Sequence, residues 1–416
     1  MKKEKLLSPF AVFLLGINSI IGSGIFLLSG HIYNKAGIYS LLAIAAAGLS
    51  ILVIALSYAN MSKLYPESGG AFVYVKNIFG PFAGFIIGML TWMLGVVTLA
   101  TEVSALMTAL QMIYPHANGK LIGLILLLLL ALVSFFGASI LNKLDSLTSL
   151  VKILIIAIFS LTCIWLFRGA NFTAQPTLSN VSPLQGFISA YGTAFFFYTG
   201  FSFLPVNADK IKDPSKTLPK MLTWVILTCT FLYLLLQTIT IGALGSSLPD
   251  SLVPAASAFS QVVGAIGVPL IIFAICISIF GVAVAASFNT PTILVSLAQA
   301  HEDVPMRVAK SNRFGAPGIA VALTFLGAVL LYLSGNYLFL SGLTVFMSFA
   351  QYLSTGFANI KKKFMFIGLG TVLFSLVLLF SFTVQVLTVG FSIVIVLSLA
   401  YFFSQKLARQ EKIKKM

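Results

Sequence analysis

Charged side chains are scarce in this chain. Asp, Glu, Lys and Arg make up 8% of its 416 residues, whereas 59% of the residues are hydrophobic and the mean hydropathy is +1.05. Ordinary soluble domains carry roughly 25% charged residues. The composition therefore excludes a water-soluble protein and indicates a chain that is embedded in a membrane.

Cysteine and histidine are also few, with three of each. The cysteines lie within apolar runs and the histidines in the loops between them: Cys163, Cys229, Cys276, His31, His116 and His301. These positions exclude a disulfide framework and the ligand spacing of a zinc site. They leave no pair of nucleophile and base at membrane depth, and the chain has no phosphate-binding loop. We therefore expect neither an enzyme nor a bound metal ion or cofactor.

Long apolar runs fill the chain instead. A helix needs roughly 20 apolar residues to cross about 30 Å of hydrocarbon. Twelve such runs follow one another, at about 8–30, 38–63, 82–113, 120–139, 146–168, 184–208, 220–244, 264–298, 317–334, 337–358, 364–383 and 386–405. No small-residue cleavage site follows the first run, so we interpret it as a retained helix rather than a signal peptide. We predict an all-α polytopic membrane protein of about twelve transmembrane helices.

The basic residues sort to one side of these spans. With the amino terminus in the cytoplasm, 21 lysines and arginines fall in cytoplasmic segments, whereas Lys35, Lys120 and Arg168 fall outside and Lys152 lies within a span. This is the positive-inside pattern. It explains the net charge of +15 without a nucleic acid partner. We predict a multi-pass protein among the lipids of the cell (inner) membrane, with both termini cytoplasmic.

Two of the spans are interrupted. The first contains Gly22-Ser23-Gly24-Ile25-Phe26, and the sixth contains Tyr198-Thr199-Gly200-Phe201-Ser202. No water reaches a bare N–H or C=O in the bilayer, so unwound backbone is tolerated only where it is buried in protein or lines a cavity. Paired breaks in corresponding halves of a chain are typical of a transporter with its substrate site at the membrane midplane.

The residues of the breaks indicate what they bind. Gly22 and Gly24 let the backbone leave helical geometry at little steric cost. The N–H groups freed there, beside the amino terminus of a half-helix, suit a carboxylate. Carbonyls freed near Phe197, Tyr198 and Thr199 suit an ammonium group. Together the breaks would hold the groups that all α-amino acids share; the alternative is that the glycines only allow close packing of helices.

Four motifs occur in order along the chain. They are Gly22-Ser23-Gly24-Ile25-Phe26, Tyr65-Pro66-Glu67-Ser68-Gly69-Gly70, Phe196-Phe197-Tyr198-Thr199-Gly200-Phe201 and Lys212-Asp213-Pro214-Ser215-Lys216-Thr217-Leu218-Pro219. In this order they resemble the amino acid–polyamine–organocation (APC) superfamily of transporters, which has the leucine-transporter fold. The resemblance implies two inverted repeats, 1–168 (helices 1–5) and 169–358 (helices 6–10), with helices 1 and 6 broken. Helices 11 and 12 and a basic tail follow at 359–416.

The resemblance also implies a secondary transporter of amino acids that works by alternating access. Its substrate would contact the residues of both breaks: Ile21, Gly22, Ser23, Gly24, Ile25, Phe196, Phe197, Tyr198, Thr199 and Gly200. Phe196 lies one helical turn before Gly200, where similar transporters place an aromatic lid over the substrate, so it is our candidate gate. The alternative is a phenylalanine that packs against lipid or neighbouring helices.

Lys152 is an ionisable residue inside the fifth span, where a charge is costly and therefore indicates function. Thr148 and Ser149 share its face of the helix, which indicates that the side chain faces protein. In similar transporters that do not use sodium, a lysine at this point stands in for a sodium ion. The resemblance implies that Lys152 ties helices 1, 5 and 8, through carbonyls near Gly16 and Ile17 and hydroxyls near Ser287. The alternative is a lysine that snorkels to the interface.

Glu102 is the ionisable residue of the third span. Small or mildly polar residues lie on its helical face: Gly84, Gly88, Thr91, Gly95, Thr98, Ala105 and Ala109. The resemblance places Glu102 near the distal end of the substrate pocket. The carboxyl there would pair with a cationic substrate side chain or carry the proton that drives uptake, and the alternative is a structural hydrogen bond between helices.

Three departures from the family pattern concern coupling. Ser202 stands where members often carry an acidic residue, and Asp209-Lys210 replaces the usual pair of acidic residues. Ala300-His301-Glu302-Asp303 replaces the typical Ala-Arg-Asp-Gly. We expect a sodium-independent carrier, coupled to protons or to amino acid exchange, for small neutral amino acids. A carrier or antiporter of cationic amino acids or polyamines is the alternative, and a transport-dead amino acid sensor is the alternative of another class. We expect a monomer or a weak homodimer.

Overall fold

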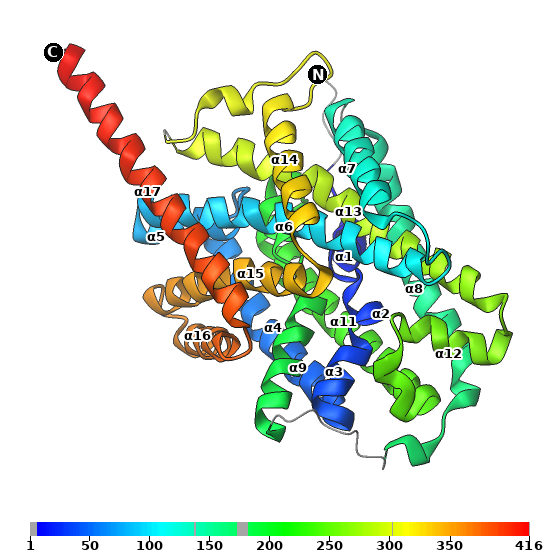
Figure 1. Cartoon of the computed structure of the whole chain (residues 1–416). Coiled ribbons are helices and arrows are strands. Elements are labelled where there is room, and N and C mark those ends of the chain that lie inside the picture. Colours follow the sequence, from blue (N-terminus) through cyan, green and yellow to red (C-terminus); the bar gives the residue numbers. More distant parts are fainter. Residues whose placement is uncertain (1–5, 137–138, 173–181, 302, 416) are drawn as a thin grey trace.

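The computed structural model describes residues 6–136, 139–172, 182–301 and 303–415 (Figure 1). Within these ranges the regular elements are helices: α1 (Pro9–Ile20), α2 (Gly24–Leu27), α3 (Ser29–Ala36), α4 (Ser40–Leu64), α5 (Ala71–Phe79), α6 (Pro81–Gln111), α7 (Gly119–Phe136), α8 (Ser139–Cys163), α9 (Pro183–Phe197), α10 (Phe203–Val206), α11 (Pro214–Leu244), α12 (Pro254–Val263), α13 (Gly267–Ala300), α14 (Gly318–Ser334), α15 (Tyr337–Lys361), α16 (Met365–Leu379) and α17 (Val384–Lys415). The prediction of an all-α membrane protein is confirmed.

The helices account for the predicted spans. In the described part of the chain, nine helical stretches are long and apolar enough to cross a membrane. The expected spans at 317–334 and 364–383 correspond to the shorter apolar helices α14 and α16. The expected span at 184–208 corresponds to α9 and α10 together. Each predicted span thus has a helical counterpart.

Both predicted breaks are present. The first lies at residues 21–23, between α1 and α2, so the helix resumes at Gly24 rather than after Phe26. The second lies at residues 198–202, between α9 and α10. Gly200 has φ +111°, a conformation that side chains rarely allow, which explains why a glycine stands there.

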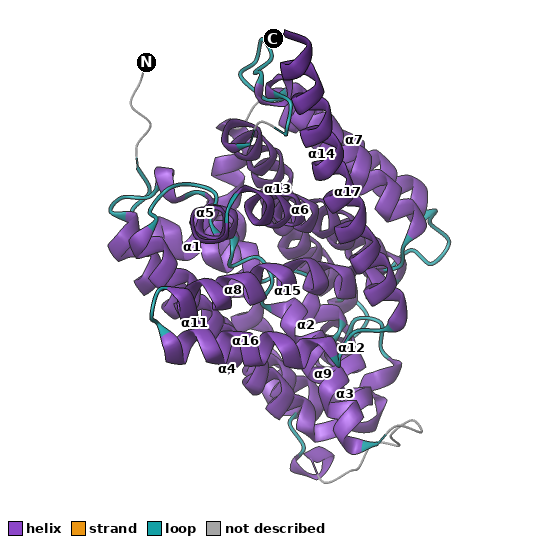
Figure 2. Ribbon diagram, turned by 90° about the vertical axis from the view of Figure 1, so that its left-hand side faces the viewer, coloured by secondary structure: helices purple, strands orange, loops and turns teal. Residues whose placement is uncertain are grey.

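The two broken helices lie against one another at the centre of the bundle. α1 contacts α10, and α2 contacts α9, so the half-helices cross in opposite directions. The long helices α6, α11, α13 and α15 surround them, and α4 packs along α9 and α11 (Figure 2). Because this packing encloses both breaks, their backbone groups are shielded from lipid, as unwound backbone in a membrane requires.

The carboxyl-terminal end of α17 marks one side of the bundle, which we call the terminal face. In Figures 1 and 2 this end of α17 lies at the top, whereas α3 and the start of α9 lie at the opposite side. His31, which we placed in a loop, lies in α3. Glu302 lies outside the described residues, as do three of the 21 basic residues counted as cytoplasmic: Lys2, Lys3 and Lys5.

We predict that the terminal face is cytoplasmic. His116, in the α6–α7 loop, and Ser311, in the α13–α14 loop, are both exposed. In a cysteine-free background, in which Cys163, Cys229 and Cys276 are replaced by alanine, His116→Cys should react with an impermeant maleimide added to intact cells. Ser311→Cys should react only after the cells are opened. The opposite pattern would contradict the orientation.

Candidate substrate site

The carboxylate of Glu102 lies directly against the first break. The backbone N–H of Ser23 donates to Glu102 Oε2 at 3.1 Å, and the Ser23 hydroxyl donates to Oε1 at 3.1 Å. The Glu102 side chain is 3% exposed, so no water shell replaces these bonds. The sequence analysis expects Glu102 at the distal end of the pocket. Its carboxylate instead accepts a hydrogen bond from an N–H group that the same analysis assigns to a substrate carboxylate.

A hydrogen-bonded chain connects this carboxylate to a third helix. Ser23 Oγ accepts a hydrogen bond from the hydroxyl of Tyr337, in α15, at 2.9 Å. The ring of Tyr337 in turn meets the ring of Phe196 edge to face, with centroids 6.2 Å apart. The break, α6, α9 and α15 therefore share one buried cluster of contacts.

The two glycines of the first break face different neighbours. A Cβ atom at Gly22 would lie 2.8 Å from Glu102 Oε1, so a side chain there would displace the carboxylate from its present position. A Cβ atom at Gly24 would lie 2.6 Å from Phe197 Cδ1 and 3.2 Å from Phe196 Cδ1. Gly22 thus makes room for a carboxylate, whereas Gly24 makes room for the two rings of α9.

Carbonyls at the second break lie close to those of the first. The Tyr233 hydroxyl, in α11, lies 2.7 Å from the Phe197 carbonyl oxygen and 3.3 Å from the Ile20 carbonyl oxygen. The two carbonyls share its single hydrogen as acceptors. A Cβ at Gly200 would collide with the Ser19 carbonyl. The breaks are therefore held together through backbone oxygens, the groups that suit an ammonium ion.

A small central cavity of about 10 Å³, roughly the space of one water molecule, lies between the breaks. Six of the predicted site residues line it: Gly22, Gly24, Glu102, Phe196, Thr199 and Gly200. The other predicted side chains are buried in the surrounding core: Ile21, Ser23, Ile25, Phe197 and Tyr198. Ser19, Ile20, Thr98 and Val282 also line the cavity. Of these, only Thr98 carried a signal in the sequence, as a member of the Glu102 face.

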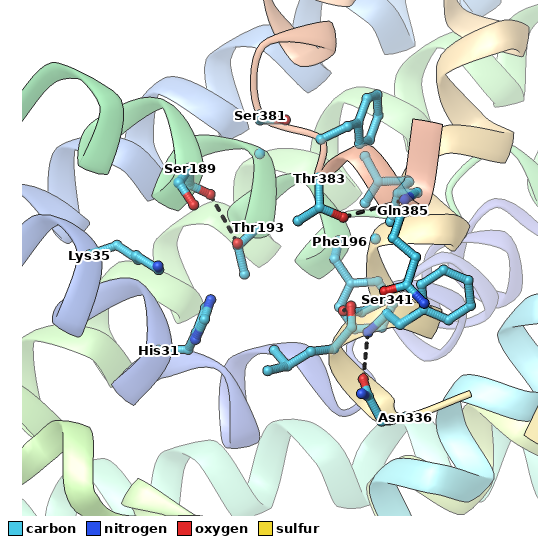
Figure 3. Close-up of a pocket in the computed structure, with 17 residues that line it drawn as sticks. His31, Lys35, Ser189, Thr193, Phe196, Asn336, Ser341, Ser381, Thr383 and Gln385 are labelled. Atoms are coloured by element: carbon cyan, nitrogen blue, oxygen red, sulfur yellow. Dashed lines mark hydrogen bonds between the residues drawn. The ribbon is translucent and has the colours of Figure 1, made fainter. Parts of the chain in front are cut away.

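Phe196 separates this central cavity from a larger one. It lines both the central cavity and an outer cavity of about 310 Å³ (Figure 3). Residues of α3 and α9 line the outer cavity, which places it on the side opposite to the terminal face (Figure 1). On the terminal face the chain is closed by backbone and side-chain bonds. Leu7 pairs with the segment at Ile211, and the Asn207 amide donates to Asn289 Oδ1 at 3.0 Å. The arrangement is closed at the centre, with Phe196 as the boundary on the outer side.

Lys152 joins α8 to the end of α1. Its ammonium donates to the Asn18 carbonyl at 2.8 Å, and the side chain is fully buried. The Thr148 hydroxyl donates to Asn18 Oδ1, and the Asn18 amide donates to the Gly281 carbonyl of α13. The three helices meet as the sequence analysis expected, but the carbonyl belongs to Asn18 rather than to Gly16 or Ile17. The Ser287 hydroxyl donates to the Val284 carbonyl in its own helix.

The partial charges at the ends of α1 and α2 explain why Lys152 and Glu102 lie where they do. The last carbonyls of a helix lack intrahelical partners and carry partial negative charge, and the first N–H groups carry partial positive charge. Lys152 therefore meets the carboxyl end of α1, and Glu102 meets the N–H group that precedes α2. The break places one buried cation and one buried anion where backbone charge complements each.

Comparison with known proteins fits this geometry. The family described as Amino acid permease matches residues 7–412. The chain belongs to the amino acid permease family. It is similar to the serine/threonine exchanger SteT of Bacillus subtilis (strain 168), with 26% identity over 83% of this chain and 80% of that protein. It is also similar to the Gamma-aminobutyric acid permease of the same organism, with 25% identity over 80% and 74% of the two chains. A third relative is the Histidine permease HisP of Lactococcus lactis subsp. cremoris (strain MG1363), with 24% identity over 86% and 80%.

These findings confirm the APC superfamily and a transporter rather than an enzyme. The resemblance that we drew from four short motifs is therefore correct over nearly the whole chain. The family implies an amino acid as the transported small molecule.

We predict that Lys152→Met abolishes transport and leaves a folded protein. Methionine keeps much of the side-chain volume but leaves the Asn18 carbonyl without this donor, which costs about 1–3 kcal/mol of stability. Exchange of labelled amino acid in proteoliposomes measures the loss, and the melting temperature and gel-filtration profile report folding. Lys63→Met, which removes an exposed lysine at the end of α4, is the matched control and should transport normally. Normal flux in Lys152→Met would show that the lysine has no part in transport.

Proposed function

We propose that this protein is a sodium-independent secondary transporter of small neutral amino acids that works by alternating access, coupled to protons or to exchange of a second amino acid. One observation carries the proposal: the break in the first helix already binds a carboxylate, that of Glu102, through the N–H and hydroxyl of Ser23. A site that binds this carboxylate has the donors that a substrate carboxylate needs.

The substrate ammonium would face the carbonyls of the second break. Thr199 and Gly200 of this break line the central cavity, opposite Gly22 and Gly24 of the first break. An amino acid with its carboxylate at Ser23 would therefore have backbone of the second break beside its ammonium group. Binding through backbone groups suits any small α-amino acid, because it uses only the atoms that these substrates share.

Lys152 supports sodium independence. Its ammonium supplies a fixed positive charge at the carboxyl end of α1 and joins α1, α8 and α13. A sodium ion at this point would repeat a charge that the chain already provides. Flux through the wild-type protein is therefore expected to be the same in sodium and choline buffers.

In alternating access, Phe196 would open and close the site toward the outer side. The contacts of Leu7 with Ile211 and of Asn207 with Asn289 would open and close it toward the terminal face. The half-helix contacts between α1 and α10 and between α2 and α9 fit two inverted repeats, 1–168 and 169–358, with 359–416 outside them. We propose that the terminal face is cytoplasmic and that the protein resides in the cell (inner) membrane. We propose a monomer or a weak homodimer.

Glu102 would couple binding to protons. Its ionised carboxylate and a substrate carboxylate compete for the same Ser23 N–H, and two like charges there repel. The ionisable groups that interact with it are Lys152, Tyr233 and Tyr337, from three different helices. A proton on Glu102 would remove the repulsion and let the substrate carboxylate bind, so one proton would accompany one amino acid.

The same contact favours one alternative, a carrier of amines or cationic amino acids. The Glu102 carboxylate at the break would pair with the ammonium group of an amine that has no carboxylate. The serine/threonine exchanger among the relatives favours the amino acid instead, and it favours exchange over net uptake. A sensor that binds without transport is the alternative of another class.

We predict that purified protein binds L-serine and L-alanine at least tenfold more tightly than their decarboxylated counterparts, ethanolamine and ethylamine. Thermal shift measures binding, because a ligand at 100 times its dissociation constant adds about 2.7 kcal/mol of stability. Glu102→Gln should retain L-serine binding, lose the pH dependence of uptake and fail to accumulate substrate. Glu67→Gln, which changes an exposed carboxylate, is the control and should behave as wild type.

Three other outcomes would contradict the proposal in different ways. Equal binding of ethanolamine and L-serine would indicate an amine carrier. A tenfold weaker apparent affinity of Glu102→Gln for L-arginine, with L-serine unaffected, would indicate a cationic substrate. Binding of amino acids without counterflow in liposomes would indicate a sensor.

A further inference from the structure

The outer cavity is large enough to hold a substrate before it reaches the breaks. Its volume of about 310 Å³ reaches the lower end of the range of small-molecule sites, roughly 300–1,000 Å³. Phe196 lines this cavity and also the central one. A molecule that approaches the breaks from this side therefore passes through the outer cavity and meets Phe196.

The walls of the outer cavity combine apolar side chains with polar ones, and they come from distant parts of the chain. Hydroxyl and amide side chains from α9, α15, α17 and the loops beside them line it: Ser189, Thr193, Asn336, Ser341, Thr383 and Gln385. These groups can donate and accept hydrogen bonds, as a zwitterion requires.

The charge of this cavity has one sign. His31 and Lys35 lie one turn apart on α3, and in Figure 3 their nitrogen atoms point into the cavity near Thr193. Among the described residues that line it, these two are the ionisable ones, and neither is acidic. The cavity therefore presents positive charge and no carboxylate.

A cation at this place is unexpected from topology. The positive-inside pattern leaves Lys35, Lys120 and Arg168 as the basic residues on this side, and Lys120 and Arg168 are exposed outside the cavity. Lys35 is half-buried and lines the cavity. Since charges on this side do not help membrane insertion, a lysine that faces a cavity here needs another explanation.

We propose that the outer cavity is an anion site in which Lys35, with His31 beside it, binds the carboxylate of an incoming amino acid and repels molecules of net positive charge. The inference rests on the proposed function and narrows its substrate class to zwitterionic or anionic amino acids. The carboxylate is held first by Lys35 and then, once Phe196 moves, by the N–H of Ser23. Lys35 raises the local concentration of such substrates at the gate.

The test compares charge variants at Lys35 with a matched control on the same side. L-serine is the probe of uptake into proteoliposomes, and L-arginine is the competing cation. Lys35→Gln should raise the KM for L-serine three- to tenfold and leave kcat within twofold. Lys35→Glu should raise the KM further and make L-arginine a stronger inhibitor. Lys120→Gln, which removes an exposed cation outside the cavity, should change neither quantity.

Two measurements separate the possible failures. The melting temperatures of the variants should match that of wild type, and a second variant, His31→Gln, should raise the KM in the same direction by a smaller factor. A KM for Lys35→Glu within twofold of wild type, with no change in inhibition by L-arginine, would overturn the anion site and leave the proposed function intact. A wild type that neither binds nor transports any amino acid would overturn both.

Discussion

A peptide N–H that has left its helix inside a membrane must find a partner, and the rest of this structure depends on how that need is met. Leaving such a group unpaired in hydrocarbon costs several kcal/mol. At the first break the partner of the Ser23 N–H is the Glu102 carboxylate. Gly22 leaves room for this carboxylate, and Tyr337 extends the hydrogen-bonded chain through the Ser23 hydroxyl.

Opposite charges flank the same break. Lys152 meets the carboxyl end of α1, and Glu102 meets the backbone just before α2. Backbone dipoles of the favourable sign lie beside each group. An isolated charge in a span is expensive, so these backbone partners explain how a buried lysine and a buried glutamate are tolerated.

The sequence was most informative where local chemistry decides structure. Glycines and interrupted apolar runs predicted both breaks, and the polar face around Lys152 predicted that its side chain faces protein; the resemblance to the APC superfamily added that it ties three helices. The partner of Glu102 could not be predicted in this way. The small residues on its face of α6 indicate that the side chain is buried, but they do not indicate which segment packs against that face. Tyr337 was missed because it lies 314 residues from Ser23, and nothing distinguishes it from the other 12 tyrosines. The register of Lys152 was also misjudged by one or two residues, since it depends on how α1 is tilted against α8.

The central claim is that Glu102 occupies the place of the substrate carboxylate. An experimental structure with a bound amino acid such as L-serine tests it most directly. The account predicts that the substrate carboxylate accepts from the Ser23 N–H and that the Glu102 carboxyl has moved away from it. A bound substrate elsewhere, with Glu102 still 3.1 Å from the Ser23 nitrogen, would contradict the account.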